Sequence, residues 1–298
     1  MKDFTVYFLV RLVISIVQAL SLRQARAFAE FMAWLANDVL HIRKRLLNEN
    51  LRHAFPELSP KEIHKLSLKV WRHLFLMVIE TAFAERKIHL SNWKKFVTLE
   101  NEEKPLQALY EHRPLIYATG HLGNFEFAGY IMGLIGIPPY SVARTLDNPY
   151  LNDYLGEFRR STGQAIIPKK DAAPLLDQAM KMGRSVVSLT DQYAGEKGLW
   201  VKSFGRDVST YKVVPILAKM FDAPVVLSAP IRHGEELFHF TIRVQEVLDP
   251  KIHTELTSPK VMAQWYNSVF EELIRMAPAQ YWWIHNRWRE KPKKQKKQ

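Results

Sequence analysis

The chain has 298 residues, of which 47% are hydrophobic and 12% aromatic, a composition that allows a sizeable core and excludes a disordered chain. It contains no cysteine, so thiol nucleophiles, disulfides and cysteine-ligated zinc are excluded. The net charge of +12 indicates an anionic partner, such as lipid head groups, a phosphorylated substrate, an acidic protein or nucleic acid.

The first predicted element is an apolar helix at residues 4–20, in which Arg11 is the one charged residue. A membrane span needs about 20 residues, and an arginine near its centre would cost about 2.5–3.5 kcal/mol on insertion scales. Three readings stay open: a marginal membrane span, a helix half-buried in the membrane interface, and a buried core helix. If the segment spans, the basic residues that follow it place the rest of the chain in the cytoplasm.

Two further helices are predicted before the first strand. Apolar residues recur at helical spacing over residues 22–51. The next helix starts after Ser59, a good N-cap, with Pro60 at its first position and Glu62 completing a capping box, and it runs to about residue 83. We therefore divide the chain into N-terminal membrane-associated helices at 1–54, an α/β domain at 55–290 and a basic tail at 291–298.

The rest of the chain alternates between short apolar runs and helical patterns. The runs read as strands at residues 96–99, 115–118, 140–143, 165–167, 185–189, 224–228 and 238–244. The helices are expected at residues 102–110, 124–135, 149–161, 171–182, 212–221 and 259–276. This alternation predicts an α/β fold with a mainly parallel sheet flanked by helices. The strictly alternating run at 238–244 predicts an antiparallel edge strand.

The most informative motif is the segment Thr-Gly-His-Leu-Gly-Asn-Phe-Glu at residues 119–126, which follows a strand and opens a helix. Ligands of open α/β sheets bind at the carboxyl ends of strands. If His121 stays in the loop and Glu126 lies in the first helical turn, the two side chains can meet, and the carboxylate would orient the imidazole as a general base. The alternative is that His121 caps the helix and Glu126 interacts with the helix dipole.

The run Gly-His-x-Gly-Asn-x-Glu resembles the His-x4-Asp/Glu motif of the lysophospholipid acyltransferase superfamily, and most closely its late lipid A acyltransferase branch, which adds lauroyl or myristoyl chains. The resemblance covers roughly residues 5–290. Further similar segments are Val-Ala-Arg-x3-Asn-Pro at 142–149, Arg-Arg at 159–160, Thr-Asp-Gln at 190–192, Phe-Gly at 204–205 and the aromatic run at 278–288.

The resemblance implies an acyltransferase that needs no cofactor and takes acyl-acyl carrier protein, or acyl-CoA, as co-substrate. It also implies a glycolipid acceptor and a place at the inner (cytoplasmic) membrane, with the active site facing the cytoplasm. His121 and Glu126 would be the catalytic pair. The other residues in the matched segments are candidates for oxyanion or substrate binding: Arg159, Asp191, Arg144, Asn148, Asn124 and Gln192.

An acyl thioester is already activated, so His121 can promote direct attack by an acceptor hydroxyl without a covalent enzyme intermediate. Arg159 is the candidate for stabilising the oxyanion, or else a salt-bridge arginine. Asp191 would anchor Arg159 or bind the acceptor, or else cap a turn. The aromatic residues 281–283 would lie at a membrane interface or pack on the sheet.

Basic residues offer further contacts, although a solvated surface explains each of them better when it is taken singly. Candidates for acceptor phosphates are Arg144, Lys202, Arg206 and Lys212, and candidates for an acidic carrier protein are Lys169, Lys170, Lys181 and Arg184. Alternative functions are transfer to a lysophospholipid or phosphoglycolipid, and a non-catalytic basic protein that binds membranes or nucleic acid. We expect no nucleic-acid partner, because such a partner leaves the His121 loop and the apolar N-terminus unexplained.

Overall fold

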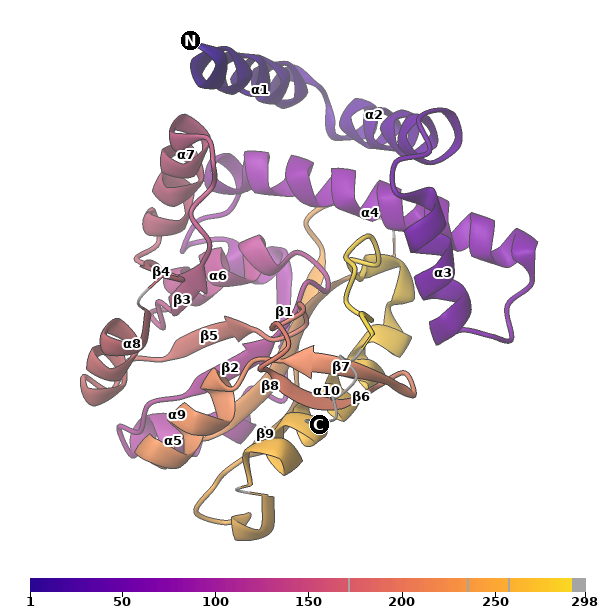
Figure 1. Cartoon of the computed structure of the whole chain (residues 1–298). Coiled ribbons are helices and arrows are strands. Elements are labelled where there is room, and N and C mark those ends of the chain that lie inside the picture. Colours follow the sequence, from indigo (N-terminus) through magenta and orange to yellow (C-terminus); the bar gives the residue numbers. More distant parts are fainter. Residues whose placement is uncertain (171, 235, 257, 291–298) are drawn as a thin grey trace.

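The computed structural model describes residues 1–170, 172–234, 236–256 and 258–290, so the predicted basic tail lies outside the described residues. Its centre is a seven-stranded sheet in the order β1-β9-β8-β2-β5-β3-β4, with helices on both faces (Figure 1). The strands are β1 Val97–Glu100, β2 Ile116–Thr119, β3 Tyr140–Ala143, β4 Ala165–Pro168, β5 Val186–Leu189, β8 Val225–Arg232 and β9 Phe240–Leu248. The mixed α/β architecture with a mainly parallel sheet confirms the predicted fold class.

Strand β9 departs from the prediction in its position. It pairs antiparallel with β8, as expected, but its other side pairs in parallel with β1, so β9 is not an edge strand. The edges of the sheet are β1 and β4. Alternating side chains are typical of an antiparallel strand whose two faces differ in burial. The same pattern does not show whether a strand pairs on one side or on both.

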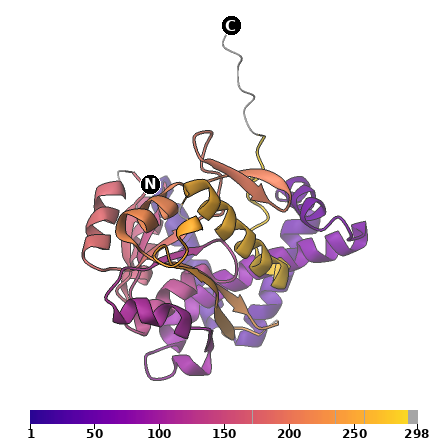
Figure 2. The same ribbon diagram turned by 90° about the horizontal axis from the view of Figure 1, so that it is seen from below.

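Helices cover the sheet on both faces. In β2, Ile116 and Ala118 pack in one hydrophobic cluster with side chains of α8, α9 and α10, whereas Tyr117 packs in another cluster with Leu109 and Met132. One face is therefore covered by α5 Glu103–Tyr110 and α6 Phe125–Leu134, and the other by α8 Ala172–Lys181, α9 Val213–Phe221 and α10 Pro259–Met276. Figure 2 shows the gold α10 and the magenta α5 on opposite sides of the strands.

The sequence did not predict the two-stranded hairpin of β6 Leu199–Ser203 and β7 Arg206–Thr210. Its strands are short and carry charged residues, so the hydrophobic pattern is weak. Its turn, Phe204–Gly205, has positive φ at both residues, and the hairpin packs against α10. Helix α7 Pro149–Arg160, which packs on α6 and β4, begins at the predicted residue.

Four helices precede the sheet, with a π-helical turn at Leu35–Val39 after the second of them: α1 Lys2–Ala19, α2 Leu22–Trp34, α3 Lys44–Ala54 and α4 Pro60–Lys87. The predicted capping box at the start of α4 is confirmed, since Ser59 and Glu62 bond each other's backbone N–H groups. The single helix predicted over 22–51 is wrong. His41 and Arg43 adopt positive φ, and the chain turns there so that α3 can pack on α4. Short 3-10 turns lie at Trp93–Lys95, Thr254–Leu256 and Pro278–Gln280.

Helix α1 carries several polar side chains on its inner face and most of its large apolar side chains on its outer face. Its inner face carries Tyr7, Arg11 and Gln18: Arg11 lies over the ring of Tyr154 in α7, and Gln18 donates to the carbonyl of Ala82 in α4. Val17 is its one buried residue, so the reading of this segment as a buried core helix is wrong. Large apolar side chains point outward from it: Phe4, Val6, Phe8, Leu9, Val10, Leu12, Val13 and Ile16. Among the described residues, no helix combines the length and the apolar character needed to cross a membrane.

Candidate active site

The loop that carries His121 connects β2 to α6 at the carboxyl end of the strand, as the sequence predicts. Asn124 is the N-cap of α6, and its side-chain oxygen accepts the backbone N–H of Phe127 at 3.1 Å. Gly123 has φ +62°, and a Cβ there would lie 1.6 Å from the carbonyl oxygen of Pro230. A side chain at this position would clash with β8, so the path of the loop requires glycine.

The carboxylate that contacts His121 belongs to Asp191, which follows β5. One of its oxygens lies 2.8 Å from His121 Nδ1, and the other accepts the backbone N–H of His121 at 2.8 Å. Burial opposes the ionisation of Asp191, but the charge and hydrogen bonds of His121, together with the charge of Arg287, outweigh it and lower its pKa to about 2. An ionised Asp191 holds the proton of the neutral ring on Nδ1, which leaves Nε2 as the basic nitrogen.

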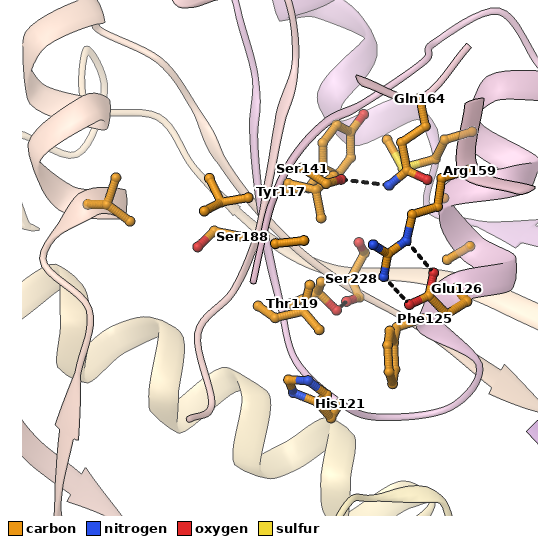
Figure 3. Close-up of a pocket in the computed structure, with 18 of the residues that line it drawn as sticks. Tyr117, Thr119, His121, Phe125, Glu126, Ser141, Arg159, Gln164, Ser188 and Ser228 are labelled. Carbon is orange, nitrogen blue, oxygen red and sulfur yellow. Dashed lines mark hydrogen bonds and ion pairs between the residues drawn. The ribbon is translucent and has the colours of Figure 1, made fainter. Parts of the chain in front are cut away.

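Glu126 does not make the predicted contact with His121. It lies in the first turn of α6, as expected, but its carboxylate forms a bidentate ion pair with Arg159 of α7, at 2.9 Å to Nε and 2.5 Å to Nη2. Figure 3 shows Phe125 between the His121 ring and this ion pair. The helix directs Glu126 towards α7, because the neighbouring position that faces the imidazole is taken by Phe125, whose ring centroid is 4.8 Å from that of His121.

A cavity of about 1350 Å³ opens beside His121 and is lined mainly by apolar side chains. It reaches between the sheet and helices α5 and α6, and also to α8 and α9. His121, Glu126, Arg159 and Gln192 all line it. Sites for small ligands usually occupy about 300–1,000 Å³, so this cavity is large enough for a long hydrocarbon chain together with a head group.

The other predicted site residues divide into two groups. Gln192 lies at the His121 ring, with its amide nitrogen 3.2 Å from Nε2. Arg144 lines the cavity but is exposed and paired with Asp147. Asn148 instead caps α7, and Asn124 is fully buried, where it donates to Glu80 and to a carbonyl of α4. Neither asparagine is part of the cavity lining.

Cationic side chains gather where β3 and β4 end. Arg144 and Lys169 line the large cavity, and with Thr145 and Lys170 they also line a second hollow of about 380 Å³. The ammonium group of Lys169 is 3.1 Å from the hydroxyl of Tyr211. Other predicted cations form local ion pairs: Lys202 with Asp207, and Lys181 with Asp177.

The sequence did not assign a site role to the C-terminal segment that lies against the catalytic loop. The backbone N–H of Trp282 donates to the carbonyl of His121 at 3.0 Å, and its ring lines the cavity and meets the imidazole edge-on. Tyr281 and Trp283 are buried, so the packing alternative for these two is confirmed and the membrane-interface alternative is wrong. The available signals were the density of aromatic residues after Pro278 and the place of residues 278–288 among the segments that carry the family resemblance.

Within the described ranges, no group of three or more His, Asp or Glu side chains is arranged to hold a metal ion. The polar groups at or near His121 are Asp191, Gln192 and, elsewhere in the cavity lining, the Glu126–Arg159 pair. This set can take a proton from a bound hydroxyl and place a positive charge nearby, which are the requirements of acyl transfer to oxygen.

Comparisons with known proteins indicate one family. Residues 1–290 match the family described as bacterial lipid A biosynthesis acyltransferase. The chain is 27% identical over 265 residues to a lipid A biosynthesis lauroyltransferase of Escherichia coli (strain K12), which covers 87% of this chain and 83% of that protein. It is 25% identical over 264 residues to a lipid A biosynthesis palmitoleoyltransferase of the same organism (87% and 82%). It is 23% identical over 259 residues to a lipid A biosynthesis acyltransferase of Haemophilus influenzae (84% and 77%).

Proposed function

Because the chain belongs to the family of bacterial lipid A biosynthesis acyltransferases and is thus an acyltransferase, we propose that it moves a fatty acyl chain from a thioester donor to a hydroxyl of a lipid A precursor or related glycolipid. The donor is the thioester of acyl carrier protein or of CoA. The observation that carries this proposal is the His121 imidazole, bound to a buried carboxylate and open to a large apolar cavity.

In the proposed reaction His121 Nε2 takes the proton of the acceptor hydroxyl as that oxygen attacks the thioester carbonyl. The new C–O bond gives a tetrahedral intermediate with a negatively charged oxygen. The C–S bond then breaks, and the departing thiolate receives the proton from the imidazolium, which returns His121 to its neutral form. Asp191 keeps its proton-accepting contact with Nδ1 throughout and stabilises the imidazolium.

Two polar groups near His121 have distinct proposed roles. The amide of Gln192 occupies the position at Nε2 that an acceptor hydroxyl needs, so we expect it to move aside and hold the acceptor. Arg159 is the candidate for stabilising the oxyanion, because it lines the cavity and its guanidinium is fixed by Glu126. In this scheme Glu126 orients Arg159, and Asp191 orients His121.

The apolar cavity would hold the acyl chain, and the cations at its rim would bind phosphates. Arg144 and Lys169 both line the cavity near the second hollow, where they would contact a phosphate of the acceptor or of the carrier's prosthetic group. A guanidinium can bind phosphate through two N–H groups, whereas an ammonium acts as a point charge. Both support a phosphorylated substrate without choosing between these two sources.

Membrane association is supported by the outward apolar face of α1. The charge of Arg11 disfavours burial in a bilayer, but this side chain is turned inward onto Tyr154. The outer face of α1 therefore presents apolar side chains to a bilayer. This is the arrangement of a helix lying in the membrane interface. We therefore expect the enzyme to act at the membrane surface, where both a glycolipid acceptor and its product reside.

Acyl transfer tests the proposal directly. Radiolabelled acyl-carrier-protein and acyl-CoA donors are offered to a panel of a lipid A precursor, a lysophospholipid and a phosphoglycolipid. We expect transfer to the lipid A precursor, and a loss of about 10²–10⁴-fold in kcat in His121→Ala. The control is His253→Ala, an exposed histidine paired with Glu255 outside the cavity, which should retain wild-type rates. Near-full activity of His121→Ala would refute the catalytic assignment, and transfer only to another acceptor would refute the substrate class.

A further inference from the structure

A buried arginine, Arg287, interacts electrostatically with Asp191 of the His121–Asp191 pair. Arg287 exposes 3% of its surface. Its Nη1 donates to the hydroxyl of Tyr281 at 3.0 Å, and its Nη2 donates to the side-chain oxygen of Asn267 in α10. Both of these partners are neutral, and a buried guanidinium is costly unless a negative charge lies nearby to balance it.

The balancing charge is that of Asp191. Burial lowers the pKa of Arg287, but the hydroxyl of Tyr281, to which it donates, and the negative charge of Asp191 offset this, and the pKa is raised. Burial, together with the neighbouring charge of Asp191, raises the pKa of Tyr281, so its hydroxyl keeps its proton while it accepts from Arg287. Because the hydroxyl oxygen accepts from Arg287, its proton is available to Asp191.

A general base has to be neutral before it reacts, and this requirement gives Arg287 a function. When His121 is neutral it cannot balance the charge of Asp191, and a carboxylate buried without a counter-charge tends to take up a proton. We propose that Arg287, acting through Tyr281, is a positioning residue that keeps Asp191 ionised while His121 is neutral, so that the imidazole stays oriented with Nε2 free to accept a proton. This inference rests on the proposed function of His121.

The backbone of the same segment supports this assignment. The N–H of Gly123 donates to the carbonyl of Gln280 at 2.9 Å, and Leu122 forms an isolated β-bridge with Tyr281. The segment thus pairs with the catalytic loop through its main chain, and through Tyr281 and Arg287 it reaches the far side of Asp191. The same segment of chain therefore interacts with the loop of His121 and with Asp191.

Other titratable groups that face this centre do not supply the charge. Burial lowers the pKa of His285, which lies near Asp191 and His121, so this ring is neutral at neutral pH. Burial raises the pKa of Tyr266, on α10 beside Arg287, to about 12, so it is also neutral. Arg289 acts on His285 but is directed onto the ring of Tyr193. Among the described residues around Asp191, Arg287 is therefore the fixed positive charge.

The test compares Arg287→Gln, Arg287→Lys and a control, Arg275→Gln, by measuring kcat, KM and the pH profile of kcat/KM in the full-length protein. We expect Arg287→Gln to lower kcat about 100-fold, with KM within a factor of about three of the wild-type value. The acidic limb of the kcat/KM profile of Arg287→Gln should move to higher pH, because loss of a nearby positive charge lets the imidazole of His121 take up a proton more readily. Arg287→Lys retains the charge and should restore the limb and part of kcat. Arg275 pairs with Glu271 on the exposed side of α10, and its variant should match the wild type.

Tyr281→Phe covers the case in which Arg287→Gln does not fold, as judged by thermal unfolding. It removes the hydroxyl alone and should lower kcat about tenfold, which corresponds to about 1.4 kcal/mol of lost transition-state stabilisation. A folded Arg287→Gln or Tyr281→Phe with wild-type kcat and acidic limb overturns the inference, as does a lysine variant no better than the glutamine variant. An active His121→Ala overturns the proposed function instead, so the two failures are distinguishable.

Discussion

Each ring nitrogen of His121 contacts a different side chain, and the two side chains have different roles at the ring. Asp191 binds Nδ1 and the backbone N–H of the same residue, so it fixes both the ring and the loop. Gln192 reaches Nε2 from the residue that follows Asp191. The side chains of two consecutive residues thus hold the two nitrogens, and a change at either position should have a separable effect.

Asp191→Asn should abolish most activity, whereas Glu126→Gln should weaken it less. An asparagine in place of Asp191 can present its amide to Nδ1 and stabilise the wrong tautomer, so we expect a loss of about 10⁴-fold in kcat. Glu126→Gln leaves that contact intact and loosens Arg159, and we expect a loss of about 10–100-fold. Steady-state kinetics with the lipid A precursor measures both. A Glu126 variant more impaired than the Asp191 variant would contradict this assignment of the two carboxylates.

The sequence identified His121 correctly as a loop residue after a strand, because a strand, a glycine and a helix start are all local signals. It could not decide which carboxylate meets the imidazole. Glu126 is close in sequence, but Asp191 is close in space only because β5 lies beside β2 in the sheet. Strand order follows from long-range pairing that no local pattern reports, and the Asp191 motif was therefore assigned to substrate or to Arg159.

At the scale of elements, a buried ion pair joins α4 to β8 beneath the catalytic loop. Glu80 and Arg232 are fully buried and bond through two N–H···O contacts, and Glu80 also accepts from Asn124, the cap of α6. We predict that Glu80→Gln lowers the free energy of unfolding by about 3–5 kcal/mol, because it leaves a buried guanidinium unbalanced. Urea denaturation measures this change.

The matched control is Glu49→Gln, which removes an exposed carboxylate that pairs with the exposed Arg45. Exposed pairs contribute about 0–1 kcal/mol, so the control should remain close to the wild type. Equal effects of the two substitutions would show that burial of the Glu80–Arg232 pair has no bearing on stability, and the link between α4 and the catalytic loop would then lose its support.

His73 makes the same junction sensitive to acid. Burial, followed by the charge of Arg232, holds its pKa well below 6.5, and Arg232 Nη1 lies 2.8 Å from its Nδ1. The folded protein keeps this ring neutral, whereas the unfolded chain takes up a proton below about pH 6.5. The contribution of His73 to the free energy of unfolding is therefore fully present above about pH 6.5. Below that pH the free energy of unfolding should fall by about 1.4 kcal/mol per pH unit, until the pH reaches the lowered pKa of His73. Urea unfolding at several pH values should show a flatter dependence in His73→Gln, and an unchanged slope would contradict this.

Elements with strong local signals were predictable, and those fixed by packing were not. The start of α4 follows from its capping box, and the bounds of α10 agree with the predicted range because Pro259 and an apolar stripe mark it. The break between α2 and α3 has no glycine or proline and depends on His41 and Arg43 in left-handed conformations. Such conformations are unfavourable for these residues, so tertiary contacts have to supply the stabilisation.

For the whole molecule, the composition and the alternation of helices and strands predicted the fold class. The strand order of the folded sheet determines which side chains meet His121. In a parallel α/β sheet the loops that follow the strands lie at the same edge. In this chain the carboxyl ends of β2 and β5 lie side by side at that edge. The C-terminal segment then crosses that edge and pairs with the His121 loop. A segment some 160 residues downstream in the chain thus contacts the His121 loop, and only the folded arrangement reveals this contact.

The outward face of α1 predicts how the whole molecule meets a bilayer. We expect the double variant Phe8→Glu, Val13→Glu to lose binding to vesicles that contain anionic phospholipid, because both side chains are exposed on that face. Burying one such side chain in an apolar medium contributes about 1.5–3 kcal/mol, so the loss should be at least about tenfold for each substitution. Vesicle co-sedimentation measures the partition.

The control for this face is Ile252→Glu, which is also an exposed apolar residue. It lies in the connection between β9 and α10, at the end of the molecule opposite α1 (Figure 1), so a bilayer against α1 would not reach it. Binding should therefore persist in Ile252→Glu and fall in the α1 variant, while transfer to a detergent-dispersed acceptor persists in both. Equal vesicle binding by the two variants would mean that the bilayer meets some other surface, and the inward turn of Arg11 would then have to be explained by packing on α7 alone.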